Sequence, residues 1–251
     1  MKNRRIQVCA ATLSLLSILS PSLYSQNHNA NPQQYFLNED KVPNSIEIIP
    51  PMPAENSARF EYDHEQYEWG KSLRDTPRGK QAVSDANLGW EPNWADDAFG
   101  EAFGSPITKE DNPELFQLVY NMEWDAGDLA VRDVKAHYNR VRPFVYWGES
   151  TATPWAEPDL KSNGSYPSGH TCIGWATALV LAEVNPARAT EILKRGFEFG
   201  QSRVIVGAHY QSDVDAGRIL GAGIVAMLHT DKGFLEQLEK AKEEAAMKQQ
   251  K

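Results

Sequence analysis

One helix-start signal recurs along this chain and predicts that it folds into α-helices. Proline directly follows Thr76, Asn112 and Asn185. A short polar residue suits the N-cap position, and proline suits the first helical turn, where its missing N–H has no intrahelical partner to lose. Alternating runs of Val, Ile and Thr bounded by turns, which would predict strands, are missing from the sequence. We therefore expect one all-α domain built as a helical bundle.

Apolar periodicity predicts where the helices lie. Apolar residues recur at spacings of three and four positions at Leu115, Val119, Met122, Ala126 and Leu129. This spacing predicts one long amphipathic helix over residues 113–139, which Pro143 follows and prevents from continuing. Further helices are expected over residues 170–184, 186–200, 209–229 and 232–248. The apolar stretches at 173–184 and 216–228 are shorter than the ~20 residues that span a bilayer, so we predict buried core helices.

The first 25 residues have the pattern of a secretory signal peptide. Three basic residues within the first five positions precede an apolar stretch at residues 6–19, and Pro21 and small residues follow it. We predict cleavage after Ser25 and export to the periplasm. A retained membrane anchor is the alternative, but the apolar stretch is short of the ~20 residues needed. A lipoprotein is disfavoured because Cys9 comes too early in the stretch.

The charge balance excludes one broad class of function. The chain has 25 Lys and Arg against 34 Asp and Glu, a formal charge of −9. Removing residues 1–25 leaves 22 basic against 34 acidic residues, a charge of −12. A general nucleic-acid binder needs a basic surplus to neutralise phosphates, and this chain has none. A local basic pocket for a single phosphate remains compatible with this balance.

Composition also divides the mature chain into two parts. Residues 26–56 are rich in Asn, Gln and Pro, and we expect an extended N-terminal arm that is ordered only if it packs on the body. Residues 57–251 form the helical domain. Loss of Cys9 with the signal peptide leaves Cys172 as the only cysteine, so stability must come from the core and not from an intrachain disulfide.

Three short motifs carry the chemistry of the chain. They are Lys135 followed after six residues by Arg142-Pro143, the sequence PSGH at 167–170, and Ser202-Arg203 followed by His209 and Asp213. Each motif alone has an ordinary structural explanation, as a solvated helix end, a turn with an N-cap, or a surface pair. Together they supply three cations, two histidines, a carboxylate and a helix N-terminus. That set predicts a site for a tetrahedral oxyanion.

Each component of this set suits the binding of an anion. Lys135, Arg142 and Arg203 supply fixed positive charge, and the two guanidinium groups can each bind two oxygens. Ser168 and Gly169 lie where backbone N–H groups point out of a helix that starts near residue 170. The absence of a side chain at Gly169 lets the anion approach the backbone closely.

The two histidines can divide the work of a group transfer. His209 and Asp213 are four residues apart on a predicted helix, so they share a face, and the carboxylate can fix the imidazole tautomer. His209 is then the candidate nucleophile, forming a phosphohistidine, and His170 is the candidate general acid and later base. This division requires a neutral His209 and a protonated His170, which predicts an acidic to near-neutral optimum.

The motifs resemble those of the phosphatidic-acid phosphatase type 2 (PAP2) and vanadium haloperoxidase superfamily. The sequence GSYPSGHT at 164–171 is similar to the narrower signature of the class A bacterial non-specific acid phosphatases. The sequences EAFG at 101–104, DAGDLA at 125–130 and SDVD at 212–215 also resemble that class. The resemblance extends from about residue 60 to residue 240.

The resemblance implies an all-helical fold and a periplasmic enzyme that needs no metal or other cofactor. It implies broad hydrolysis of small phosphomonoesters, phosphotransfer to alcohols and inhibition by vanadate. The family's roles fall on His209 as nucleophile, His170 as acid and Asp213 as orienting carboxylate, with Lys135, Arg142, Ser168, Gly169 and Arg203 at phosphate-binding positions. The division between the two histidines rests on the resemblance, because the spacing of His170 and His209 alone leaves it open.

Two positions depart from the class and bear on substrate preference. Cys172 stands where a small hydroxyl residue is expected, and a buried apolar thiol is its alternative role. Tyr210 stands where an indole is common, which would reshape the cavity for the leaving group. His64, His137 and His229 have no spacing typical of metal ligands and are assigned to structural or surface roles.

Other functions remain open from the sequence. An apyrase-like pyrophosphatase would use the same site on a terminal phosphate, and a haloperoxidase would bind vanadate there as its cofactor. A phosphate-binding protein without activity is the rival from another class, although it leaves the His209–Asp213 pair without a purpose. A membrane-lipid phosphatase is disfavoured because no spanning helix is predicted. We expect small phosphomonoesters and phosphate as ligands, no nucleic acid or membrane insertion, and a homo-oligomer.

Overall fold

A computed structural model of the chain describes residues 35–88 and 93–249, and the regular secondary structure within them is helical, with no strand. The all-α prediction is therefore confirmed. The predicted signal peptide at 1–25 lies outside the described residues. The α-helices are α1 (Ser45–Ile48), α2 (Ala58–Ser72), α3 (Pro77–Ser84), α4 (Trp94–Phe103), α5 (Pro113–Trp124), α6 (Arg132–Tyr138), α7 (Pro143–Tyr146), α8 (Glu157–Lys161), α9 (Gly169–Val184), α10 (Ala189–Ile205), α11 (Gln211–Leu228) and α12 (Lys232–Gln249). The short elements are the 3₁₀ turns η2 (Glu39–Lys41), η3 (Asp85–Asn87), η5 (Pro154–Ala156) and η6 (Pro186–Arg188), and the π-helical turn η4 (Asp125–Leu129).

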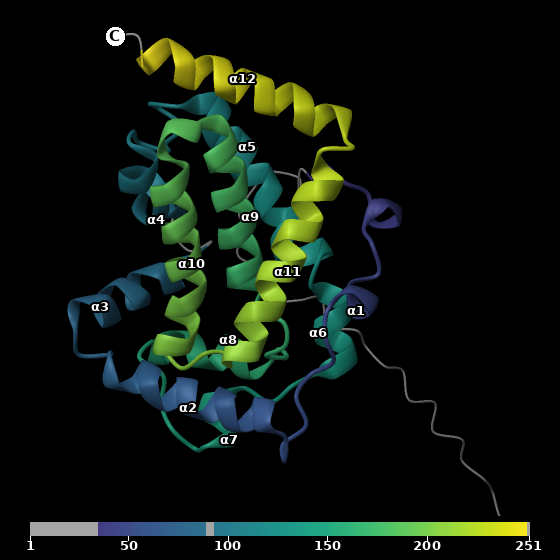
Figure 1. Cartoon of the computed structure of the whole chain (residues 1–251), viewed down its shortest axis with the longest axis vertical. Coiled ribbons are helices and arrows are strands. Elements are labelled where there is room, and N and C mark those ends of the chain that lie inside the picture. Colours follow the sequence, from purple (N-terminus) through teal and green to yellow (C-terminus); the bar gives the residue numbers. More distant parts are fainter. Residues whose placement is uncertain (1–34, 89–92, 250–251) are drawn as a thin grey trace, which may run out of the picture.

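Helix α9 is the centre of the bundle. It makes its most extensive contacts with α10 and α11, which run beside it, while α12 lies across one end of the bundle and α2 across the other (Figure 1). Residues on all sides of α9 are buried, among them Ile173, Val180 and Leu181. A helix that is apolar all round belongs in a protein core. The prediction that 173–184 forms a buried core helix is confirmed.

Glycines let α10 and α11 approach α9 closely. A Cβ atom at Gly174 of α9 would lie 2.2 Å from the Phe199 ring of α10. A Cβ atom at Gly217 of α11 would lie 2.6 Å from the backbone oxygen of Ser168, directly before α9. Such distances are too short for any real side chain. The absence of a side chain at Gly217 therefore fixes how close α11 comes to the PSGH motif.

The three proline signals do mark helix starts, although by different capping contacts. Thr76 caps α3, and its hydroxyl accepts a hydrogen bond from the Gly79 amide. Pro113 and Pro186 also occupy the first turns of α5 and η6. The side chains before them bond elsewhere, however, since the amide of Asn112 donates to Ser105 and that of Asn185 to the Phe103 carbonyl.

The prediction of one helix over 113–139 is wrong, because the segment is interrupted. Helix α5 ends at Trp124, the π-helical turn η4 follows, and α6 begins only at Arg132. The N-terminal arm contacts the chain at this interruption. Asp125 accepts hydrogen bonds from the amides of Phe36 and Leu37 at 3.1 and 2.9 Å, and Asp128 accepts one from the Tyr35 hydroxyl at 2.7 Å. A π turn contains one more residue than a turn of α-helix, which shifts the positions of the side chains that follow. Here both carboxylates of the turn bond to the arm.

Two other boundaries differ from the expected ones. Helix α10 runs from residue 189 to 205, later at both ends than the predicted 186–200, because η6 precedes it. Helix α11 begins at Gln211 and not at 209, so that His209 lies before it. Gly207, with a φ of +84°, makes the turn between the two helices. Helices α9 and α12 agree with prediction to within one residue at each end.

The described part of the arm, residues 35–56, packs against the body and is not entirely extended, since it contains η2 and α1. Leu37 and Ile49 are buried, and the Tyr166 hydroxyl donates to the Pro50 carbonyl at 2.5 Å. Among all the helices described, none combines the length and the apolar character that crossing a bilayer requires.

Candidate active site

His209 and Asp213 are in contact, but not for the reason that the sequence suggested. His209 precedes α11, so the two residues do not share a helix face, and that expectation is wrong. Asp213 lies in the first turn of α11, and its Oδ2 accepts a hydrogen bond from the Tyr210 amide at 2.9 Å. The same oxygen lies 3.3 Å from Nδ1 of His209. The capping contact at the start of α11 thus turns the carboxylate back onto the imidazole.

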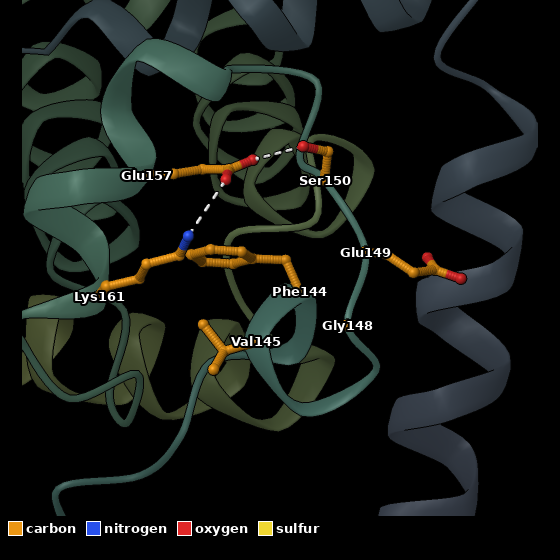
Figure 2. Close-up of a pocket in the computed structure, with 7 residues that line it drawn as sticks. All are labelled: Phe144, Val145, Gly148, Glu149, Ser150, Glu157 and Lys161. Carbon is orange, nitrogen blue, oxygen red and sulfur yellow. Dashed lines mark hydrogen bonds and ion pairs between the residues drawn. The ribbon is translucent and has the colours of Figure 1, made fainter.

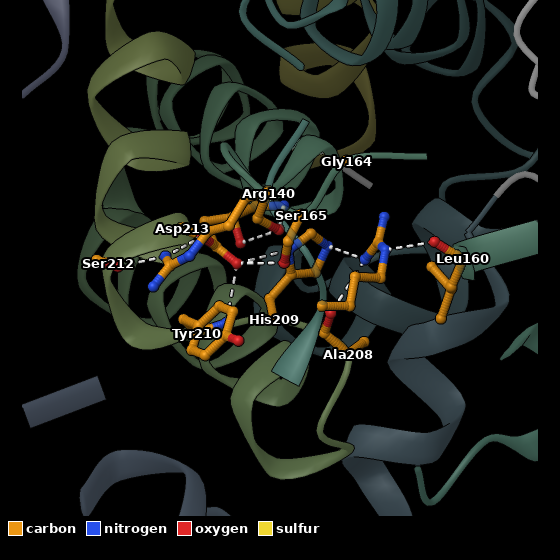
Figure 3. Close-up of polar contacts among 12 residues, drawn as sticks. Arg140, Leu160, Gly164, Ser165, Ala208, His209, Tyr210, Ser212 and Asp213 are labelled. Atoms are coloured by element: carbon orange, nitrogen blue, oxygen red, sulfur yellow. Dashed lines mark hydrogen bonds and ion pairs between the residues drawn. The ribbon is translucent and has the colours of Figure 1, made fainter. Parts of the chain in front are cut away.

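The other ring nitrogen of His209 faces Arg142. The guanidinium Nη1 of Arg142 donates to the Ala208 carbonyl and to Nε2 of His209, both at 3.0 Å. Arginine has no acceptor, so Nε2 must carry the lone pair and Nδ1 the proton, which points to Asp213. Figure 3 shows the His209 ring with Asp213 and Ser165 to one side and Leu160 to the other. His209 is therefore a neutral imidazole whose basic nitrogen is Nε2.

The second histidine lies at the start of α9. His170 is half-buried, and its Nε2 is 3.4 Å from the backbone oxygen of Ala86 in η3. The pKa of His170 is lowered well below its ordinary value by burial, and further by the positive charge of Arg203. The pKa of His209 is lowered by burial and by Arg142. Both imidazoles are thus disposed to be neutral while no anion is present.

Three cations surround the histidines. Lys135 on α6 donates from Nζ to the Gly164 carbonyl at 2.7 Å, and Arg203 lies on α10 with 1 % of its surface exposed. Burial lowers the pKa of Lys135, and repulsion by Arg142 adds to that effect. Burial and repulsion by Arg203 lower the pKa of Arg142 to about 9. The three predicted cations therefore lie close enough to repel one another, and they are called, together with His170 and His209, the histidine pocket.

The PSGH motif supplies the helix N-terminus that the sequence predicted. Ser168 is the N-cap of α9, and its hydroxyl oxygen accepts hydrogen bonds from the amide and the hydroxyl of Thr171 at 3.3 and 2.9 Å. The Ser168 amide donates to the Asp213 carbonyl at 3.0 Å, so this amide points away from the pocket. Gly169 is the first helical residue, and a Cβ atom there would lie 3.9 Å from Cε of Lys135.

A buried ion network behind the pocket was missed in the sequence. Arg140 donates to Asp213 and to Asp63 of α2, and Ser165 donates to Asp213. Ser212 contacts both Asp63 and Arg140. Arg140 and Ser165 lie within or beside the motifs, but no spacing rule singles them out. Asp63 had no signal at all, because it is distant in sequence from every motif.

The two atypical positions are both buried. Cys172 is fully buried, and burial raises the pKa of its thiol, in agreement with the role of a buried apolar residue. Tyr210 is 1 % exposed, and its ring lies 3.7 Å from the guanidinium carbon of Arg140. The Tyr210 ring therefore packs against the ion network, and its effect on the cavity for the leaving group stays a prediction.

The other three histidines within the described residues make their contacts elsewhere. His64 stacks on Trp147 with 4.8 Å between ring centroids, His137 contacts Tyr138, and His229 lies 2.9 Å from Glu183. In residues 35–88 and 93–249, no group of three or more His, Cys, Asp or Glu side chains is placed to hold a metal ion.

A surface hollow of about 420 Å³ flanks α7 and α8 (Figure 2). Its lining includes Phe144, Glu157 and Lys161, with Glu157 lying between Lys161 and Ser150. None of the residues that line it belongs to the histidine pocket. The hollow is therefore distinct from the group formed by the two histidines and the three cations.

Comparison with known proteins identifies one superfamily and several similar bacterial acid phosphatases. Residues 126–235 match the model of the PAP2 superfamily. The chain is 46% identical over 246 residues to a non-specific acid phosphatase of Providencia stuartii, covering 98% of both chains. It is 42% identical to the non-specific acid phosphatase of Salmonella typhimurium, covering 89% of each. An acid phosphatase of Zymomonas mobilis is 34% identical, with 94% of this chain and 89% of that protein covered.

Proposed function

Because the chain belongs to the PAP2 superfamily, as one of the class A bacterial non-specific acid phosphatases, we propose that it hydrolyses small phosphomonoesters through a phosphohistidine on His209. The observation that carries the proposal is the arrangement around Nε2 of His209, to which Arg142 donates at 3.0 Å while Lys135 and Arg203 lie close enough to repel one another's charge and that of Arg142. Mutual repulsion of buried cations is relieved when a dianion binds among them. A phosphate group supplies that charge directly beside the nucleophilic nitrogen.

The first step of this mechanism transfers the phosphoryl group to the enzyme. As the phosphate group binds, the hydrogen bond from Nη1 of Arg142 to Nε2 of His209 opens and this donor turns to a phosphate oxygen, which frees the lone pair of Nε2. Nε2 then attacks phosphorus, the N–P bond forms and the P–O ester bond breaks. Asp213 accepts a hydrogen bond from the Nδ1–H group of His209 and stabilises the positive charge that develops on the ring. His170, protonated in the complex, gives its proton to the departing alcohol oxygen.

The second step returns the enzyme to its starting state. His170, now neutral, removes a proton from a water molecule as its oxygen attacks phosphorus. The N–P bond breaks, the electron pair returns to Nε2 of His209, and inorganic phosphate leaves. An acceptor alcohol in place of water would give phosphotransfer by the same step. Vanadate, which adopts the geometry of the transition state, should inhibit at this pocket.

The phosphate oxygens would be held by charged groups and by the start of α9. Arg142 and Arg203 can each donate two hydrogen bonds in a plane, and Lys135 contributes a compact charge. The Ser168 hydroxyl already accepts from Thr171, and its own proton is suited to donate to a phosphate oxygen. The backbone at Gly169 lies at the positive end of α9, which favours an anion. No metal ion has a part in this scheme.

The proposal also covers location and assembly. The signal-peptide pattern at 1–25 supports export to the periplasm with cleavage after Ser25. Small soluble phosphomonoesters would be the substrates there. A homo-oligomer remains part of the proposal, to be measured by light scattering on the mature protein.

The experiment that tests the function measures phosphate release from an aryl phosphate by the mature protein, in a chelator, between pH 4 and 9. We expect activity on the acid side that the chelator does not affect and that vanadate abolishes. His209→Ala should abolish both turnover and covalent labelling by ³²P-labelled substrate. Absence of phosphate release across the whole pH range, from folded protein, would refute the proposal. Halide oxidation with added vanadate, or phosphate binding without turnover, would then be measured.

A further inference from the structure

A buried arginine joins two carboxylates behind the histidine pocket. Arg140, which follows α6, donates from Nη1 to Oδ1 of Asp213 at 2.6 Å and from Nη2 to Oδ2 of Asp63 at 2.8 Å. The side chain of Arg140 is 5% exposed, and those of both carboxylates are fully buried. The guanidinium therefore links α2 to the first turn of α11 without touching the phosphate pocket.

This contact divides the two oxygens of Asp213 between different partners. Oδ1 accepts from Arg140, whereas Oδ2 accepts from the Ser165 hydroxyl at 2.5 Å and the Tyr210 amide at 2.9 Å, and faces His209 at 3.3 Å. A carboxylate bonded on both oxygens cannot rotate about its Cβ–Cγ bond without breaking several of these contacts. The bond from Arg140 to Oδ1 thus helps to fix the orientation of Oδ2 towards His209.

We propose that Arg140, anchored by Asp63, is a positioning residue for the His209–Asp213 pair, and that it keeps Asp213 ionised and correctly oriented in acid. The inference rests on the proposed function, because it assigns a role in the step carried out by His209. Asp213 must be an anion to hold the Nδ1 proton of His209 and to stabilise the charge that develops on attack.

The charges around Asp213 support this role. Burial alone would raise the pKa of Asp213, but Arg140 first and then His209 outweigh it and hold that pKa well below its ordinary value. Lys135 and Arg142 also face this carboxylate from α6 and the segment before α7. Arg140 is the cation in direct contact, and its charge acts on Asp213 over a hydrogen-bond distance.

Asp63 anchors the guanidinium from the side of α2. Asp63 also accepts hydrogen bonds from the amide and the hydroxyl of Ser212, at 2.7 and 2.6 Å. The ring of Tyr210 covers the guanidinium. Burial raises the pKa of Asp63 above its ordinary value, against the opposing effect of Arg140, and Asp63 carries no positive charge that could lower the pKa of Asp213. Its contribution to the pair must therefore be geometric, which separates its expected effect from that of Arg140.

Three variants test the proposal: Arg140→Gln, Arg140→Lys and Asp63→Asn. Arg140→Gln removes the cation, so the pKa of Asp213 should rise, and the acid limb of the kcat profile, which is the fall of kcat at low pH, should move up by about one pH unit or more. Arg140→Lys keeps a charge but cannot reach both carboxylates, and should restore the limb in part. Asp63→Asn should lower kcat at all pH values without moving the limb upward. Vanadate affinity should change less than about threefold in each, because none of these groups touches the anion.

The matched control is the buried pair Arg195–Asp85, which joins α10 to η3. These residues are 8% and 5% exposed, as buried as the network behind Asp213, but they do not contact it. Arg195→Gln should lower thermal stability and leave the acid limb where it is in the wild type. If the variants only lost packing, the acid limb would move by the same amount in Arg140→Gln and in Arg195→Gln, and vanadate would bind more weakly to every variant.

The outcomes separate this inference from the proposed function. An inactive wild-type protein would refute the function itself. An active wild type whose acid limb is unchanged in folded Arg140→Gln or Arg140→Lys would refute the role of Arg140 alone. If Arg140→Gln does not fold, Arg140→Lys and Asp63→Asn decide: an unshifted acid limb in the lysine variant, or vanadate affinity that falls in parallel with kcat, would overturn the proposal.

Discussion

Nη1 of Arg142 lies 3.0 Å from Nε2 of His209 and donates a hydrogen bond to it, so the guanidinium holds the nitrogen that is proposed to attack phosphorus. The same Nη1 also donates to the Ala208 carbonyl, and Nε donates to the Leu160 carbonyl at 2.7 Å. These backbone contacts fix the guanidinium independently of the histidine. Arg142 therefore keeps Nε2 unprotonated while no anion is bound, and it must give up this hydrogen bond before the lone pair of Nε2 can attack phosphorus.

Replacement of Arg142 by Met should affect both binding and protonation. The loss of a charge-assisted contact to a buried anion corresponds to about 1.5–3 kcal/mol, so inhibition by phosphate and vanadate should weaken by roughly 10- to 100-fold. The pKa of His209 should rise, because Arg142 is the cation that lowers it most after burial. Inhibition constants and the pH profile of kcat/KM measure the two effects. Unchanged vanadate affinity in the folded variant would contradict the placement of Arg142 at the anion.

The helices and the site motifs could be predicted from sequence because their signals are local. A cap residue followed by proline predicted the starts of α3 and α5, and apolar spacing predicted the core face of α5. The interruption at η4 could not be predicted in this way. It coincides with bonds between Asp125 and the amides of Phe36 and Leu37, more than 80 residues away, which leave no periodic trace.

The geometry of the site also depends on contacts between residues that are far apart in the chain, which the sequence does not reveal. Sequence reasoning placed His209 on a helix, although the bonded geometry depends on Gly207 ending the turn and on Asp213 capping α11. The pairing of Asp213 with Arg140, and of Arg140 with Asp63, joins residues that are far apart in the chain. Charged residues in a sequence are ordinarily solvated, so their burial as a network appears only in three dimensions.

His170→Ala should slow turnover by an amount that depends on the leaving group. A general acid contributes about 10²- to 10⁴-fold when the departing oxygen is basic, and much less when it is an acidic phenol. We expect a large loss of kcat with an alkyl phosphate and a small loss with a nitrophenyl phosphate. A series of aryl phosphates of graded phenol pKa measures this as a steeper dependence of rate on leaving group. Equal losses for all esters would show that His170 is not the acid.

The protonation of His170 should depend on bound phosphate. In the empty pocket its pKa is lowered by burial and then by Arg203 and His209, whereas a phosphate dianion beside the ring opposes these effects. The basic limb of kcat should therefore lie about one pH unit or more above that of kcat/KM, after the ionisation of the substrate is subtracted. His170→Ala provides the control, because it should remove the limb from kcat. Coincident limbs would contradict a pKa that responds to the anion.

Gly169→Ala should separate folding from anion binding. A Cβ atom at this position would lie 3.7 Å from the Gly127 carbonyl and 3.9 Å from Cε of Lys135, which are ordinary contacts. The fold therefore tolerates alanine, and the reduced freedom of the unfolded chain should stabilise the protein by about 0.4–1 kcal/mol. An anion at the start of α9 would meet the added methyl group, so phosphate inhibition should weaken by about tenfold. Thermal melting and inhibition constants test both halves, and unchanged inhibition would place the anion elsewhere.

Asp125 should make the protein relatively more stable in acid than a variant that lacks its carboxyl group. Burial raises the pKa of Asp125 to about 7 in the folded chain, against ~4 when unfolded. The folded state thus binds this proton more tightly, and its contribution to stability is full below pH ~4 and lost as pH rises through ~7. His170 and His209, whose pKa values are lowered, act in the opposite direction, so the test is a difference between variants.

Urea unfolding of the wild type and of Asp125→Asn at pH 5 and pH 8 measures that difference. Relative to the wild type, the variant should gain about 1–3 kcal/mol between pH 5 and pH 8, because only the wild type loses the proton. Asp128→Asn is the matched control, since Asp128 lies in the same turn and also bonds to the arm through Tyr35. It should lower stability while leaving the contribution of Asp125 in place. A gap between wild type and Asp125→Asn that does not change with pH would mean that Asp125 is ionised in the folded protein, and that its charge is held by the amides of Phe36 and Leu37.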